Sequence, residues 1–123
     1  MKVKTLETLT IIINSAPYGN EKVWNALRLA TASISVSIGM SVNVFLLGDA
    51  VVAARKGQKP PEGYYNLEKM LRDLLRSGAK VAACGTCLNA RALSKEDLID
   101  DIEVGTMLKL AGWIKESSKV FSF

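Results

Sequence analysis

A short apolar run near the start of the chain, residues 9–14 (LTIIIN), constrains the fold more than any other segment. It is rich in β-branched residues, it lacks the polar alternation of a half-exposed strand, and turn-forming residues follow it at 15–20. Continuous apolar strands of this kind occur where helices cover both faces of a sheet, as they do in parallel sheets. The run therefore predicts a strand inside a parallel α/β sheet.

Strand-like and helix-like segments alternate along the rest of the sequence, with short connections between them. This alternation predicts a single α/β domain over residues 1–123, with three α/β/α layers around a mostly parallel sheet. The further strands are expected at residues 41–47, 80–84, 103–105 and 119–123. The residues expected to begin or end the helices are Asn20 and Gly39, Asp49, Asn66 and Gly78, Ser94, and Thr106.

The first expected helix, over residues 21–38, contains two conflicting patterns. Asn20 suits its N-cap, and apolar residues recur at helical spacing after it. Residues 33–38, however, alternate in polarity with period two, as a half-exposed strand does. Because no turn signal separates these residues from the clearly helical part, we predict that the helix continues to Ile38 and that Gly39 ends it.

The charge of the chain is modest and dispersed. The net charge is +4, and the sixteen Lys and Arg residues form no longer run than Arg55-Lys56. Nucleic-acid-binding domains gather basic charge on one face, so we expect no nucleic-acid partner. Residues 96–103 are acidic, and we interpret them as a solvated helix face rather than as a metal site.

The hydrophobic segments do not favour a membrane protein. Residues 29–48 carry no charge over a length that would span a bilayer, but Ser, Thr and Asn residues interrupt them throughout. Residues 1–5 lack the apolar core of a secretory leader. With two cysteines and no export signal, a reducing cytoplasm is the expected compartment, with no membrane partner.

Ligand sites in open parallel sheets lie beyond the carboxyl ends of the strands. Here these ends lead into residues 14–20, 48–49 and 84–87, which we expect to converge on one pocket that contains both cysteines. Tyr18 would supply an aromatic wall, although it could equally be a turn residue that half covers the end of the sheet. The candidate binding residues are Pro17, Tyr18, Gly19, Asn20, Asp49, Gly85, Thr86 and Arg91.

The pair Cys84-Gly85-Thr86-Cys87 is the candidate catalytic centre. Backbone N–H groups at the start of a helix lower the pKa of a thiol, and Arg91 lies one helical turn beyond Cys87. A thiolate is the form that attacks or accepts sulfur. A cysteine at a strand end can also be an inert buried side chain, but two cysteines at this spacing make that reading less favourable.

Several other chemistries fit the residues poorly. Structural zinc needs four Cys or His ligands, and the chain has two cysteines and no histidine, so only a site shared between subunits would serve and no metal or cofactor is expected. The absence of histidine also disfavours acyl transfer. Thioredoxins carry C-x-x-C after an early strand and cover it with a later proline, whereas no proline follows Pro61 here. A reversible disulfide between Cys84 and Cys87 stays open.

The sequence resembles the DsrE/DsrF-like family, which includes the YchN-like and TusD-like proteins of sulfur relay. The most specific match is Cys84 to Arg91 (CGTCLNAR), and the turn at Pro17, the 48–51 segment, the acidic short helix and the last strand also fit. The resemblance implies a five-stranded parallel sheet and a homo-oligomer, either a trimer or a hexamer. It also implies that Cys84 accepts sulfane sulfur as a persulfide, while Cys87 matches the second cysteine of the YchN-like branch.

Three functions follow from these observations. The leading hypothesis is a sulfur carrier in which the Cys84 thiolate takes sulfur from a donor and yields it to an acceptor protein or small thiol, with Cys87 as a resolving thiol. The second is a non-catalytic oligomeric module that binds a small ligand or a partner loop. The third is a dithiol redox sensor. Whether the protein is an enzyme is left open by the sequence.

Overall fold

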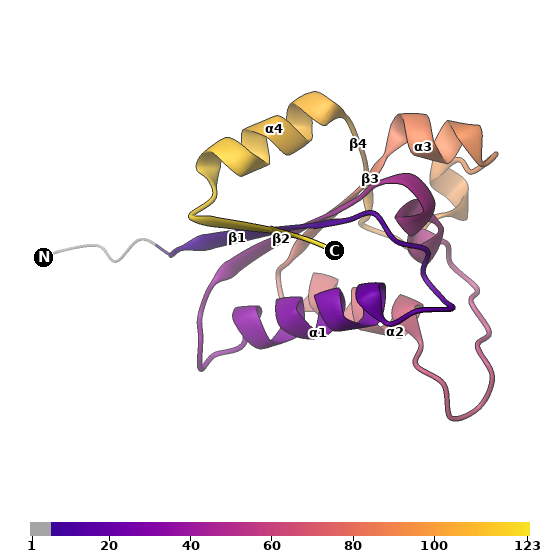
Figure 1. The fold of residues 1–123 in the computed structure, drawn as a ribbon, viewed down its shortest axis with the longest axis horizontal. Coiled ribbons are helices and arrows are strands. Elements are labelled where there is room, and N and C mark those ends of the chain that lie inside the picture. The colour runs from indigo at the N-terminus through magenta and orange to yellow at the C-terminus, as the bar shows by residue number, and fades with distance from the viewer. Residues whose placement is uncertain (1–5) are drawn as a thin grey trace, which may run out of the picture.

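The computed structural model describes residues 6–123, which form a five-stranded sheet between two layers of helices (Figure 1). The strand order is β4-β3-β2-β1-β5, and each neighbouring pair runs parallel. Helices α1 and α2 cover one face and α4 lies over the other. The expected three-layer α/β/α fold is confirmed. Residues 1–5, on which the expectation about a leader rests, lie outside the described residues.

The elements follow the predicted order, with two 3₁₀ helices, η1 and η2, among them. The strands are β1 Thr8–Ile13, β2 Ser41–Leu46, β3 Lys80–Cys84, β4 Glu103–Gly105 and β5 Lys119–Ser122. The helices are α1 Lys22–Ile34, η1 Gly48–Ala54, α2 Leu67–Arg76, α3 Gly85–Ala90, η2 Lys95–Asp97 and α4 Met107–Glu116.

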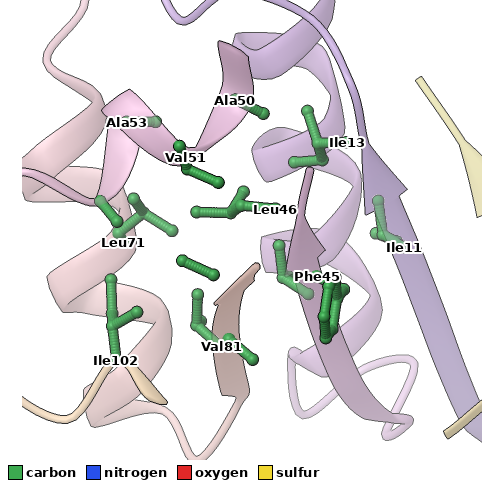
Figure 2. Close-up of a cluster of buried hydrophobic side chains, with 14 of the residues drawn as sticks. Ile11, Ile13, Phe45, Leu46, Ala50, Val51, Ala53, Leu71, Val81 and Ile102 are labelled. Carbon is green, nitrogen blue, oxygen red and sulfur yellow. The ribbon is translucent and has the colours of Figure 1, made fainter. Parts of the chain in front are cut away.

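The core lies on both sides of the central strands. On one side Leu46 of β2 points toward Val51 of η1 and Leu71 of α2 (Figure 2). On the other side the ring of Phe45 meets Trp113 of α4 edge to face, with ring centroids 5.9 Å apart. Because successive side chains of a strand point to opposite faces, β2 is buried on both sides from Val42 to Leu46, and Asn43, the polar residue in this run, donates a hydrogen bond to the hydroxyl of Thr10.

Most of the predicted helix boundaries are confirmed. The side chain of Asn66 accepts a hydrogen bond from the backbone N–H of Lys69, and Thr106 does the same for Lys109. Ser94, which was predicted to begin a helix, forms a capping box with Asp97 around η2. These side chains satisfy N–H groups that the first turn of a helix leaves without partners.

The prediction for the first helix was wrong at both ends. The helix begins one residue later than expected, with Glu21 at the N-cap, while Asn20 accepts a hydrogen bond from the N–H of Lys22 at 2.9 Å. It ends at Ile34 instead of Ile38, and Ile38 is exposed. The Ser35 hydroxyl donates to a carbonyl of the preceding turn, which competes with helical hydrogen bonding and favours an end here.

The part of the chain that the structure describes, residues 6–123, contains no helix that is long and apolar enough to cross a membrane. The uncharged stretch at 29–48 is divided between α1, a turn and β2.

Close packing at the edge of the sheet leads to a test of the core. A Cβ atom added at Gly105 of β4 would lie 2.8 Å from Cε2 of Phe45, a buried ring held against Trp113. We expect Gly105→Ala to lower the free energy of unfolding by about 1–3 kcal/mol through overpacking. Chemical denaturation measures this loss.

Gly112→Ala is the matched control. Gly112 lies in α4, where an added Cβ atom meets nothing within 4 Å. Alanine is the better helix former, so this variant should be more stable than the wild type by about 0.5–1 kcal/mol. A Gly105→Ala protein as stable as the wild type would show that β4 does not press on Phe45.

Candidate functional site

The carboxyl end of β3 positions the first cysteine. Cys84 is the last residue of β3 and the N-cap of α3, so the chain turns from strand to helix at this residue. Gly85 follows beneath β4, where an added Cβ atom would lie 3.1 Å from Cγ1 of Val104. A glycine therefore permits the close approach of α3 to the neighbouring strand. Thr86 is exposed between the two cysteines.

The two cysteines are free thiols in different environments. Cys84 is 6% exposed, whereas Cys87 is half-buried in the first turn of α3. The backbone N–H of Gly48 donates a hydrogen bond to the Sγ atom of Cys87, with an N···S distance of 3.2 Å. The loops after β2 and β3 therefore meet at the cysteine pair, as predicted.

Arg91 and Asp49 join the same two loops. Nη2 of Arg91 lies 2.8 Å from Oδ1 of Asp49, and Nη1 donates to the carbonyl oxygen of Cys87 at 3.0 Å. Asp49 was predicted to cap a helix over 50–55, but η1 begins at Gly48 with Leu47 at the N-cap, and the carboxylate binds Arg91 instead. Arg91 thus connects α3 to η1 and holds the backbone of Cys87 in place.

The expectation that Cys84 ionises easily is not met in this conformation. Burial raises the pKa of the Cys84 thiol, and the side chain of Cys87 raises it further through a hydrogen bond. The backbone N–H groups of Cys87 and Thr86 act in the opposite direction, but the pKa stays above its ordinary value. The sequence reveals which thiol ends a strand, but the extent of its burial depends on the folded protein.

Tyr18, in the loop after β1, contacts a different part of the chain from the one predicted. The hydroxyl of Tyr18 donates to Oε1 of Gln58 at 2.6 Å and accepts a hydrogen bond from the N–H of Leu67. Tyr18 also stacks on Tyr65, with ring centroids 5.7 Å apart. These partners belong to the 56–67 segment, so Tyr18 supports that segment instead of forming a wall beside Cys84.

The other residues of this loop have structural partners in the same region. Pro17 is half-buried and Gly19 is exposed with φ +97°, a conformation that suits a turn. The carbonyl oxygen of Asn20 accepts the hydroxyl of Tyr65. Sequence reasoning missed the aromatic cluster at this place, because it joins residues of two segments that are distant in the sequence. Its members are Tyr18, Trp24, Tyr64 and Tyr65.

Glu68 fixes the beginning of the 56–63 segment, which has the Pro and Gly content of a flexible loop. Its Oε1 atom accepts the backbone N–H groups of Gly57 and Gln58, both at 2.8 Å, and its Oε2 atom binds Arg72. Burial alone would raise the pKa of Glu68, but these hydrogen bonds and the charge of Arg72 together hold it below its ordinary value of 4.5. The carboxylate thus links the segment to α2 and, through Gln58, to Tyr18.

Comparison with known proteins places these features in a family. The sequence matches the DsrE/DsrF-like family over residues 7–123. Protein YchN of Escherichia coli (strain K12) is 41% identical over 118 residues, which cover 96% of this chain and 100% of YchN. The uncharacterized protein MK0008 of Methanopyrus kandleri is 42% identical over 118 residues, covering 96% of this chain and 95% of MK0008.

Solved structures agree with the sequence matches. The crystal structure of the YchN protein from E. coli has a TM-score of 0.89 to this fold, with 96% of this chain and 100% of that chain covered. A protein of unknown function from Methanobacterium thermoautotrophicum, MTH1491, has a TM-score of 0.73 at 12% identity, covering 95% and 99% of the two chains. At that identity it shows a shared fold only.

The contacts of Glu68 predict a pH-dependent contribution to stability. Because the pKa of Glu68 is lowered in the folded protein, the ionised carboxylate stabilises the fold above pH 4.5, and this contribution is lost as the pH falls through the folded pKa. We expect Glu68→Gln to cost about 1–2 kcal/mol near neutral pH and much less near pH 3. Denaturation of both proteins at the two pH values measures the difference.

Glu62→Gln is the control, since Glu62 is exposed on the same segment and takes no part in these hydrogen bonds with Gly57 and Gln58. Its stability should follow that of the wild type at both pH values. An equal cost of Glu68→Gln at both pH values would contradict the role of the charge.

Proposed function

The chain belongs to the DsrE/DsrF-like family, and from this premise we propose that its cysteine pair accepts sulfane sulfur and passes it on, with Cys84 holding the sulfur as a persulfide. The resemblance found in the sequence is confirmed, including the likeness to YchN. The sulfur chemistry itself is our proposal, and it is supported by the arrangement of the two thiols.

The observation that carries the proposal is the buried thiol of Cys84 beside the half-buried thiol of Cys87, both free, at the carboxyl end of β3. A persulfide on Cys84 would be shielded from solvent thiols that would otherwise remove its outer sulfur. The neighbouring Gly48 N–H and the connection between Arg91 and Asp49 support a fixed geometry around the pair. A reducing compartment such as the cytoplasm, which we propose as the location, suits two free thiols.

The transfer step balances without a cofactor. A protein thiolate attacks the outer sulfur of a donor persulfide R–S–SH, a new S–S bond forms to the protein, and R–S⁻ leaves with the electron pair. An acceptor thiolate then attacks the outer sulfur of the protein persulfide and regenerates the protein thiolate. The attacking group in each step is a thiolate, so the rate depends on the ionised fraction of the thiol, and the sulfur transfer itself does not require a histidine as general base.

A dithiol redox sensor is the second candidate function. It is favoured by the C-x-x-C spacing of two free thiols and by the effect of the Cys87 side chain, which raises the pKa of Cys84. In this reading an oxidant joins Cys84 and Cys87 in a disulfide, and a small thiol reverses the reaction. The two functions differ in whether the protein gains a sulfur atom.

We further propose that the protein acts as a homo-oligomer, a trimer or a hexamer. Exposed apolar side chains gather along β4 and the beginning of α4, where Val104, Met107 and Leu108 are all exposed. Leu108 is 83% exposed, and exposed apolar side chains that occur together indicate an interaction surface more often than single ones do. A second copy of the chain is the occupant that we propose for this surface.

The sulfur-carrier proposal is tested by weighing the intact protein after incubation with a small-molecule persulfide. The wild type should gain sulfur and keep it through a brief wash with a small thiol, which removes the sulfur only on prolonged treatment. Cys84→Ala should retain almost none after a brief wash with that thiol, because the shielded position is lost. Equal retention by the wild type and Cys84→Ala would contradict Cys84 as the carrier, and a disulfide without added sulfur would favour the redox sensor.

The oligomer proposal is tested by Leu108→Asp. A charge in the centre of an apolar interface is strongly unfavourable, so this variant should form smaller particles than the wild type in light scattering. Val36→Asp is the control, since Val36 is fully exposed in the turn after α1. A Leu108→Asp protein of the same mass as the wild type, or a monomeric wild type, would contradict the proposed interface.

A further inference from the structure

The two sulfur atoms of the site differ in accessibility. The side chain of Cys84 is buried at the end of β3 (6% exposed), whereas Cys87 is half-buried. An incoming donor persulfide must bring its outer sulfur into line with the attacking sulfur, so the more accessible thiol meets it first. Accessibility therefore favours Cys87 as the first point of contact.

A backbone donor faces Cys87. Gly48 is the first residue of η1, where N–H groups have no partner inside the helix, and its N–H donates to the Sγ atom of Cys87 at 3.2 Å. A hydrogen bond of this kind is stronger when the acceptor is an anion. Gly48 has φ +55°, a conformation that side chains rarely adopt, so a glycine suits the turn that presents this N–H.

The position of this donor relative to the sulfur is fixed by Arg91. The guanidinium binds the carbonyl oxygen of Cys87 and the carboxylate of Asp49 at once, and Asp49 directly follows Gly48. The same side chain therefore anchors the residue that carries the sulfur and the residue next to the donor. Arg91 therefore keeps the Cys87 thiol close to the N–H of Gly48.

Cys84 lies in a more enclosed environment. Burial raises the pKa of its thiol, and the hydrogen bond with the side chain of Cys87 raises it further. A thiol that keeps its proton attacks slowly, but the same burial protects a persulfide once it has formed.

We propose that Cys87 is the entry thiol of the pair, which takes sulfur from the donor and hands it to Cys84 for storage. This assignment rests on the proposed sulfur-carrier function and deepens it. It also reverses the order expected from the sequence, in which Cys84 attacks first and Cys87 resolves.

The two steps balance in atoms and electrons. The Cys87 thiolate attacks the outer sulfur of R–S–SH, which gives Cys87–S–SH and R–S⁻. Cys84 then loses its proton to the released thiolate or to water and attacks the outer sulfur of Cys87–S–SH. The products are Cys84–S–SH and the Cys87 thiolate, so the sulfane sulfur moves without a net change in oxidation state.

The entry role is tested by the rate at which cysteine persulfide loads sulfur onto three proteins, followed by intact mass. Cys84→Ser should load at close to the wild-type rate, because Cys87 is present. Cys87→Ser should load at least about tenfold more slowly, because only the shielded thiol remains. Ala90→Ser, at an exposed residue of the same helix α3, is the matched control and should load like the wild type.

Equal loading rates for Cys87→Ser and the wild type would overturn the entry role. Release of sulfide with a disulfide between Cys84 and Cys87 in the wild type would overturn the handover, because attack would then fall on the inner sulfur. Thermal denaturation of each variant verifies that it is folded.

A measurement on the wild-type protein keeps the test independent of the variants. Brief treatment with iodoacetamide, followed by peptide mapping, shows which thiol reacts first. We expect Cys87 to be alkylated at least about tenfold faster than Cys84. Faster alkylation of Cys84 would overturn the entry role. A wild type that gains no sulfur from the persulfide would contradict the sulfur-carrier function, whichever cysteine is alkylated first.

Discussion

Burial of both faces of the central strands is the constraint on which the rest of the structure depends. β2 is buried from Val42 to Leu46, and helices must therefore cover both sides of it. Strands covered in this way are joined by crossovers and run parallel, so their carboxyl ends meet at one edge of the sheet. The loops after β2 and β3 are neighbours for this reason, and the cysteine pair lies where they meet.

The site uses this edge with few charged groups. Gly48, at the beginning of η1, and Cys87, in the first turn of α3, meet through a single N–H···S hydrogen bond. The ion pair between Arg91 and Asp49 joins the two segments, although an exposed ion pair of this kind contributes little to stability by itself. Its value lies in geometry, because a small shift of either segment would separate the donor from the sulfur.

The sequence predicted the fold well, because the relevant signals are local. The apolar strand at 9–14, the capping residues Asn66 and Thr106, and the capping box at Ser94 all act through neighbours in the chain. The predicted end of α1 was wrong by four residues, because the pattern at 33–38 is ambiguous. The hydrogen bond from the Ser35 hydroxyl to a carbonyl of the preceding turn favours the earlier end.

The site could be predicted only in part. The position of Cys84 and Cys87 at a strand end follows from the sequence, and so does the proximity of residues 48–49 to this pair. The partners of Tyr18 do not, because Gln58 and Leu67 reach it through a segment whose path no local pattern specifies. The unequal burial of the two thiols is likewise a property of the packed protein, and it is this inequality that gives them separate roles in our account.

The most direct test of the central claim is a crystal structure of the protein after exposure to a small-molecule persulfide and removal of the excess donor. The account predicts one additional sulfur atom bonded to Sγ of Cys84, with Cys87 reduced and still within reach of the Gly48 N–H. An unmodified Cys84, or a disulfide between the two cysteines, would contradict it.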